Sequence, residues 1–123
     1  MYTSEFQSID INTLTTFSPY QDQPEVDNER VNKIVTLYKQ QIELYNNISF
    51  EQPIVVCEWS GIGEGIPVKL QSGNINRQPY TIIDGQHRVC ALRVIKDKFP
   101  NFNQSIHIFV HKVNTLQQVK QIG

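Results

Sequence analysis

The chain has 123 residues, of which 39% are hydrophobic and 19% are charged, and its net charge is −1 at pH 7. This length fits one compact domain with its own core, so we expect a single domain over residues 1–123. The longest apolar runs are too short to cross a bilayer, and the N-terminus lacks the basic and apolar segments of a secretory signal. We therefore expect an intracellular protein, cytoplasmic or nucleoid-associated, without a membrane partner.

The net charge hides an uneven distribution along the chain. Residues 1–64 contain three Lys or Arg and ten Asp or Glu, a net charge of −7, whereas residues 65–123 contain eight and two, a net charge of +6. A basic half of this kind can contact a polyanion such as DNA, or it can attract the acidic half within one fold. Both interpretations stay open on the sequence alone.

The first part of the chain predicts one strand and one helix. Residues 1–24 are mainly polar, and we expect a short strand over residues 9–14 followed by a loop over residues 17–24. From Asp27, a good N-cap, apolar residues recur at steps of three and four and predict a helix that ends at residues 46–47. The apolar positions of this helix are Val31, Ile34, Val35, Tyr38, Ile42 and Tyr45.

The next part predicts strands that lead into a second helix. A β-branched run over residues 53–59 is typical of a strand, a glycine-rich turn follows, and residues 66–70 and 80–83 predict two more strands joined by a polar loop. Three consecutive strands joined by turns favour a meander. After Gly85 the apolar period changes from two to about 3.6, which predicts a helix that Pro100 ends.

The C-terminal part predicts a last strand over residues 106–110 and the start of another helix capped at residues 114–115. The chain reaches Gly123 when this helix has scarcely begun, as expected of a domain that is minimal or truncated at its C-terminal end. The fold class that follows is α+β, with a small mixed or antiparallel sheet of about four to five strands and two to three helices.

The stretch YTIIDGQHRVCAL, residues 80–92, contains a strongly polar segment inside an apolar run. This segment, called the pentapeptide below, consists of Asp84, Gly85, Gln86, His87 and Arg88. It lies between a predicted buried strand and the start of a predicted helix, where free backbone N–H groups and the positive end of the helix dipole favour an anion. The sequence therefore predicts a phosphate site at this helix start.

Each residue of the pentapeptide has a chemical role in such a site. Gly85 permits a positive φ and close backbone approach, Gln86 can donate an amide hydrogen bond, and the side chains of His87 and Arg88 offer donors suited to phosphate oxygens. Asp84 would repel an anion, so we expect it to hold Mg²⁺, to accept a proton from a substrate hydroxyl, to cap the helix or to orient its neighbours. The catalytic candidates are therefore Asp84 and His87. The alternative without a ligand is a helix cap that forms a salt bridge to Arg88.

The order of these motifs resembles the ParB/sulfiredoxin-like superfamily, and the pentapeptide is the motif that names its DGQHR-domain (DndB-like) members. Pro-Tyr-Gln at residues 19–21 precedes the first helix, Gln-Pro-Ile-Val-Val at residues 52–56 forms the next strand, and residues 85–91 match the helix start of ParB N-terminal domains. The resemblance covers most of the chain. It implies a bound nucleoside triphosphate, ATP or CTP, with Mg²⁺ at Asp84, and it adds Gln21 and Gln52 to the binding residues.

The chain departs from each branch of this superfamily. Residues 22–23 are Asp-Gln where the ParB loop continues into Pro-Arg, and His87 stands in place of the first arginine of the ParB helix motif. Gln86 occupies the place of the reactive cysteine of sulfiredoxin, which excludes sulfiredoxin activity. The ParB-like free-serine kinases carry Asp-Gly-His-His-Arg, and in that case Glu58 or Glu64 could serve as the base.

Several functions are consistent with these motifs. The leading hypothesis is a nucleotide-binding domain that holds phosphates at the start of the helix and serves DNA binding or processing, with DNA contacted through the basic half. The alternatives are an ATP- or ADP-dependent small-molecule phosphotransferase and a non-catalytic interaction domain, for which self-association is an option. Hydrolysis of the nucleotide stays open, and nuclease activity is less favoured because no cluster of metal-binding carboxylates accompanies Asp84.

Overall fold

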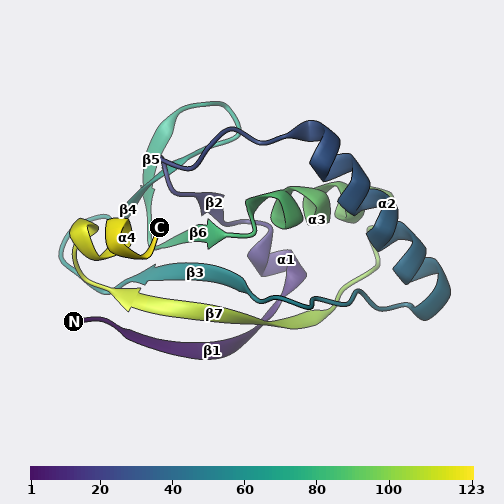
Figure 1. Cartoon of the computed structure of the whole chain (residues 1–123), viewed down its shortest axis with the longest axis horizontal. Coiled ribbons are helices and arrows are strands. Elements are labelled where there is room, and N and C mark those ends of the chain that lie inside the picture. The colour runs from purple at the N-terminus through teal and green to yellow at the C-terminus, as the bar shows by residue number, and fades with distance from the viewer.

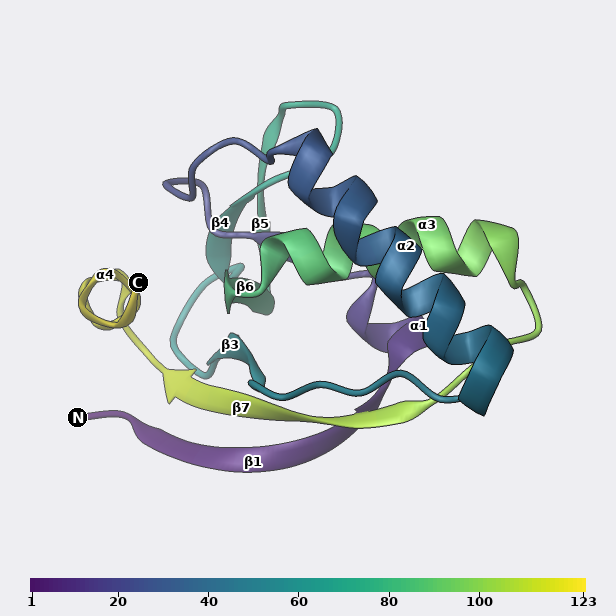
Figure 2. The same cartoon turned by 45° about the vertical axis from the view of Figure 1, so that its right-hand side comes forward.

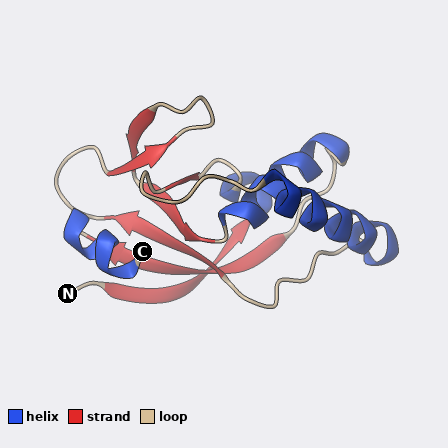
Figure 3. Cartoon of the chain, turned by 45° about the horizontal axis from the view of Figure 1, so that its top comes forward, coloured by secondary structure: helices blue, strands red, loops and turns tan.

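The computed structural model describes residues 1–123 and has an α+β fold with four helices, a five-stranded mixed sheet and a two-stranded sheet (Figures 1 and 3). The fold class is therefore confirmed, with more helices than the two to three that the sequence predicts. In chain order the elements are β1 (Thr3–Asp10), α1 (Ile11–Leu14), β2 (Ser18–Pro19), α2 (Asn28–Tyr45), β3 (Ile54–Trp59), β4 (Ile66–Lys69), β5 (Ile75–Gln78), β6 (Tyr80–Asp84), α3 (Gln86–Lys98), β7 (Ser105–Val113) and α4 (Leu116–Ile122).

The large sheet has the strand order β1-β7-β3-β6-β2. β1 is antiparallel to β7, β7 is parallel to β3, β3 is antiparallel to β6, and β6 is parallel to the short β2. Figures 1 and 2 show α1, α2 and α3 together on one side of this sheet and α4 near the far end of β7. β6, which leads into the pentapeptide, is thus flanked by strands on both sides.

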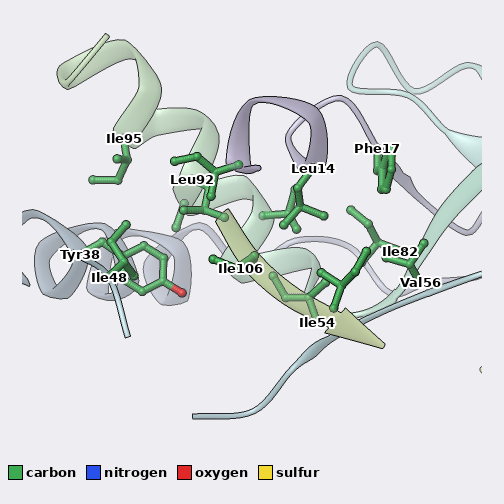
Figure 4. Close-up of a cluster of buried hydrophobic side chains, with 14 of the residues drawn as sticks. Leu14, Phe17, Tyr38, Ile48, Ile54, Val56, Ile82, Leu92, Ile95 and Ile106 are labelled. Atoms are coloured by element: carbon green, nitrogen blue, oxygen red, sulfur yellow. The ribbon is translucent and has the colours of Figure 1, made fainter. Parts of the chain in front are cut away.

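The main core lies between the sheet and the helices. A cluster of 18 buried residues joins the two layers, and Figure 4 shows Ile106 and Ile54 of the sheet on one side of this core and Leu92 of α3 and Leu14 of α1 on the other. A smaller cluster of six residues on the opposite face of the sheet includes Val119 of α4. Because apolar packing holds β6 and α3 on either side of the pentapeptide, the start of α3 is fixed in position.

The expected strand over residues 9–14 is wrong. β1 ends at Asp10, and the next four residues form α1. The Asp10 carboxylate accepts a hydrogen bond from the backbone N–H of Thr13 at 2.8 Å, so it caps a helix where apolar residues suggested a strand. This single turn directs Ile11 and Leu14 into the core, where both are fully buried.

The expected meander is also wrong. β3 pairs with β6 and β7, whereas β4 pairs with β5 in a separate two-stranded sheet. β5 occupies part of the segment that the sequence predicts to be a polar loop. Its side chains are largely exposed, so β5 is held to the buried β4 by backbone pairing and shows no apolar alternation in the sequence.

The three longer predicted helices and the last strand are confirmed. Asp27 caps α2 by accepting from the backbone N–H groups of Glu29 and Arg30, and Asn46 ends the helix with φ 50°. α3 ends before Pro100, and Thr115 caps α4 through a capping box with Gln118. None of the helices has the length and apolar character needed to cross a membrane.

Candidate functional site

The pentapeptide connects the end of β6 to the first turn of α3. Gly85 is the N-cap of α3 with φ 104° and ψ 19°, a conformation that favours glycine. A Cβ atom at this position would lie 3.0 Å from Cγ1 of Ile54 and 3.0 Å from Nη2 of Arg88. No side chain caps the helix, so the expected capping role of Asp84 is not found.

The first turn of α3 presents free backbone donors. The first internal hydrogen bond of the helix runs from the N–H of Val89 to the carbonyl oxygen of Gly85 at 3.0 Å. The backbone N–H groups of Gln86, His87 and Arg88 have no acceptor among the backbone and side-chain hydrogen bonds of the chain. These groups and the helix dipole make the start of α3 electropositive.

The Gln86 side chain holds a distant segment against α3. Its Nε2 donates to the carbonyl oxygen of Pro24 at 2.9 Å, and the residue is 7% exposed. The neighbouring Gln23 donates from Nε2 to the carbonyl oxygen of Ile83 at 2.9 Å. The segment before α2 is therefore tied to β6 and α3 by two amide side chains, and the Gln86 amide is directed to this segment.

His87 joins the starts of two helices. The backbone N–H of Asp27, the N-cap of α2, donates to Nε2 of His87 at 3.0 Å. Burial and the nearby Arg30 guanidinium lower the pKa of His87, and the Asp27 carboxylate opposes this shift only in part. The ring is therefore neutral with Nε2 as an acceptor, and its Nδ1–H is the donor left for a ligand.

Arg88 is bound to the segment before β3. Its Nη2 donates to the carbonyl oxygen of Pro53 at 3.3 Å and its Nη1 donates to that of Gln52. The Asp84 carboxylate lies 4.0 Å from Nη2, and the Asp84 side chain is 72% exposed. The guanidinium donors that the sequence predicts for a phosphate thus bind backbone carbonyl oxygens. The positive charge of Arg88 nevertheless stays beside the start of α3.

A polar groove of about 650 Å³ opens beside the pentapeptide. Its walls come from the segment before α2, from α2, from the segment before β3 and from the start of α3. Figure 2 shows α2 crossing close to α3. The lining residues are Gln23, Pro24, Arg30, Leu37, Gln41, Ser49, Phe50, Glu51, Gln52, Asp84, Gly85, Gln86, His87 and Arg88.

The groove brings together the pentapeptide and Gln52, but it does not include Gln21. The backbone N–H of Gln21 donates to the carbonyl oxygen of Pro67, and Gln21 lines a separate hollow beside β4 and β5. Glu58 and Glu64 are also absent from the groove; Glu58 accepts a hydrogen bond from the hydroxyl of Tyr80 at 3.0 Å. Asp84 belongs to no group of three or more potential metal-ligating side chains.

Sequence reasoning missed Arg30, Gln23 and Gln41 as residues of the groove. Arg30 lies on the exposed side of the first turn of α2, and the only signal for it is the N-cap position of Asp27, which the His87 contact places next to α3. Gln23 and Gln41 have no local signal, because long-range packing alone brings them to the groove.

Comparison with known proteins assigns the chain to no family. No protein-family model, no curated protein and no solved structure matches the chain. The resemblance to the ParB/sulfiredoxin-like superfamily therefore rests on the order of sequence motifs alone.

Proposed function

We propose that the chain is a nucleotide-binding domain and that the phosphates of a nucleoside triphosphate, ATP or CTP, bind at the first turn of α3. The observation that carries the proposal is the set of free backbone N–H groups at Gln86, His87 and Arg88, three residues that line the groove. α3 has 13 residues, so its dipole is developed, and backbone donors at such a helix start favour phosphate oxygens.

Positive side chains beside this turn support the same ligand. Arg30 lines the groove from α2, and Arg88 keeps its charge there although its donors are used by carbonyl groups. Arg30 forms no salt bridge and donates no side-chain hydrogen bond within the chain. Arg30 is therefore the guanidinium that can turn toward an anion without loss of an internal contact.

The size of the groove and its carboxylate fit a nucleotide with a metal ion. A volume of about 650 Å³ lies within the range of small-molecule sites, roughly 300 to 1,000 Å³. Mg²⁺ typically binds one or two carboxylates together with phosphate oxygens and water, and Asp84 would supply such a carboxylate. The Nδ1–H of His87 would donate to a phosphate oxygen, because its Nε2 already accepts from Asp27.

The proposed role in DNA binding or processing has weaker support. Several cations of the basic half act within the fold: Arg77 donates to the carbonyl oxygen of Gly65, Arg93 donates to that of Thr15, and Lys112 pairs with Glu5 at 2.8 Å. Direct contact with DNA phosphates predicts an affinity that falls steeply with salt, and an affinity with little salt dependence would argue against such contact.

Calorimetric titration with ATP, CTP, GTP and ADP in the presence of Mg²⁺ tests the proposal. A charge-assisted hydrogen bond contributes about 1.5 to 3 kcal/mol, so Arg30→Gln should weaken affinity about tenfold or more. Lys33→Gln is the matched control, because Lys33 lies one turn further along α2, pairs with Glu29 and does not line the groove. No binding of any nucleotide at millimolar concentration, or equal losses in both variants, would reject the phosphate site.

A second candidate function is a non-catalytic domain in which the pentapeptide serves the fold. The side chains of Gln86, His87 and Arg88 all bond to backbone groups of other segments, which favours this alternative. It predicts that Gln86→Ala lowers stability while no nucleotide binds to the unsubstituted chain. The same calorimetric titration therefore separates the two candidates.

A further inference from the structure

β1 forms an unprotected edge of the large sheet. It has eight residues and pairs only with β7, and no other element lies beyond it in Figures 1 and 2. Edge strands are commonly protected by Pro, Lys, a bulge or a short length. β1 contains no Pro, Gly or Lys, and its register with β7 is unbroken from residue 3 to residue 10.

The direction of the free backbone groups follows from the register. The backbone N–H of Ile11 donates to the carbonyl oxygen of Gln104 at 2.9 Å, one step beyond the pair of Asp10 and Ser105. In an antiparallel ladder, hydrogen-bonded pairs alternate along the strand. The odd-numbered residues of β1 therefore bond to β7, and the even-numbered residues Ser4, Phe6 and Ser8 direct their N–H and C=O groups to the open edge.

The side chains of β1 make this edge suitable for association. Phe6 is 64% exposed, and its ring lies 4.8 Å from that of Phe109 on β7, so an aromatic pair stands at the border of the sheet. Glu5 is neutralised by Lys112, whose Nζ lies 2.8 Å from its carboxylate. The edge thus combines free backbone groups, an exposed aromatic ring and little unpaired charge.

We propose that β1 pairs antiparallel with β1 of a second copy of this chain, around a twofold axis at Phe6, and that the two large sheets become one continuous sheet. Such an axis is perpendicular to the sheet, so the side chains of two residues that lie opposite each other point to the same face of the sheet. With the axis at Phe6, Ser4 lies opposite Ser8 of the other copy and the two Phe6 residues form a hydrogen-bonded pair.

Charge and side-chain complementarity select this register. An axis at Phe6 places Glu5 opposite Gln7 of the other copy, whose amide can donate to the carboxylate. An axis one residue earlier would place the two Glu5 carboxylates opposite each other, which is unfavourable. An axis one residue later would place Phe6 opposite Ser8 and separate the aromatic rings. The chosen register continues the row formed by Phe6 and Phe109 across both copies.

Sedimentation of the full chain over a range of concentrations tests the proposal. The unsubstituted chain should form a dimer, and Phe6→Lys should be monomeric at the same concentrations because the twofold axis would bring two cations together. Leu44→Lys is the matched control, since Leu44 is an apolar residue of α2 with 71% exposure, and it should leave the dimer intact. A chain that stays monomeric at millimolar concentration would overturn the proposal, as would a dimer that survives Phe6→Lys with unchanged strength.

Oxidative cross-linking tests the register in a background of Cys90→Ala. A hydrogen-bonded antiparallel pair has a Cα separation of about 5.5 Å, which a disulfide can bridge. Phe6→Cys should therefore cross-link to itself, and Ser4→Cys should cross-link to Ser8→Cys in a mixture but not to itself. Cross-linking of Ser4→Cys alone, or no cross-linking at position 6, would reject the axis at Phe6.

Discussion

Replacement of Gly85 by Ala should destabilise the chain through two separate effects at the start of α3. The residue has φ 104°, and a left-handed conformation costs a residue with a Cβ about 1 to 2 kcal/mol. The new Cβ would lie 3.0 Å from Cγ1 of Ile54, a side chain of 1% exposure that cannot easily move. Overpacking of this kind costs about 1 to 3 kcal/mol, so the free energy of unfolding should fall by roughly 2 to 5 kcal/mol.

Urea denaturation of Gly85→Ala and Gly73→Ala separates the two effects. Gly73 also has a positive φ, 90°, but a Cβ there meets no atom within 4 Å. Gly73→Ala should therefore show the backbone effect alone, and the difference between the variants should equal the cost of contact with Ile54 and Arg88. Equal losses, or a stable Gly85→Ala, would refute the view that the start of α3 is closely packed against β3.

Three further predictions follow from the contacts of the pentapeptide and from the two thiols. Arg88→Met should lower the free energy of unfolding by roughly 1 to 3 kcal/mol in urea denaturation, because two backbone carbonyl groups lose a charged donor; an unchanged midpoint would contradict this. Burial and Arg30 lower the pKa of His87 in the folded chain, so the stability that the neutral ring contributes should be fully present above pH 6.5 and should be lost as the pH falls below that value. His87→Gln should reduce this dependence of the free energy of unfolding on pH. An unaltered pH dependence in the variant would contradict the assignment to His87. Burial raises the pKa of the Cys57 thiol to about 12, so a thiol reagent should label Cys90 alone in the folded chain, and rapid labelling of Cys90→Ala would show that Cys57 is accessible.

The sequence predicts those parts of the fold that local patterns determine. α2 and α3 carry apolar residues at helical spacing, and both bounds of α2 follow from its caps, Asp27 and Asn46. α1 could not be predicted, because a helix of four residues is too short to show a helical period, and Ile9 and Ile11 alternate as they would in a strand. β5 could not be predicted for a different reason. Backbone pairing holds this strand, and its exposed side chains resemble those of a loop.

The candidate site shows a similar division between local and long-range effects. The free donors at the start of α3 follow from the position of the pentapeptide between a strand and a helix, which the sequence predicts. The hydrogen-bond partners of its side chains cannot be predicted from the sequence, because they are distant along the chain. Gln86 bonds to a residue 62 positions away, His87 to one 60 positions away and Arg88 to one 36 positions away. Tertiary packing therefore decides that these side chains hold the fold together, while the same residues line the groove.

The most direct test of the phosphate site is a titration of the ¹⁵N-labelled chain with Mg²⁺ and a nucleoside triphosphate, followed by amide chemical shifts. Because the free N–H groups are the proposed ligands of the phosphates, the largest shift changes should occur at the amides of Gln86, His87 and Arg88, with smaller changes at Arg30. Titration with Mg²⁺ alone is the control and should leave these amides unchanged. Saturable shifts confined to other parts of the chain, or none at millimolar nucleotide, would contradict the account.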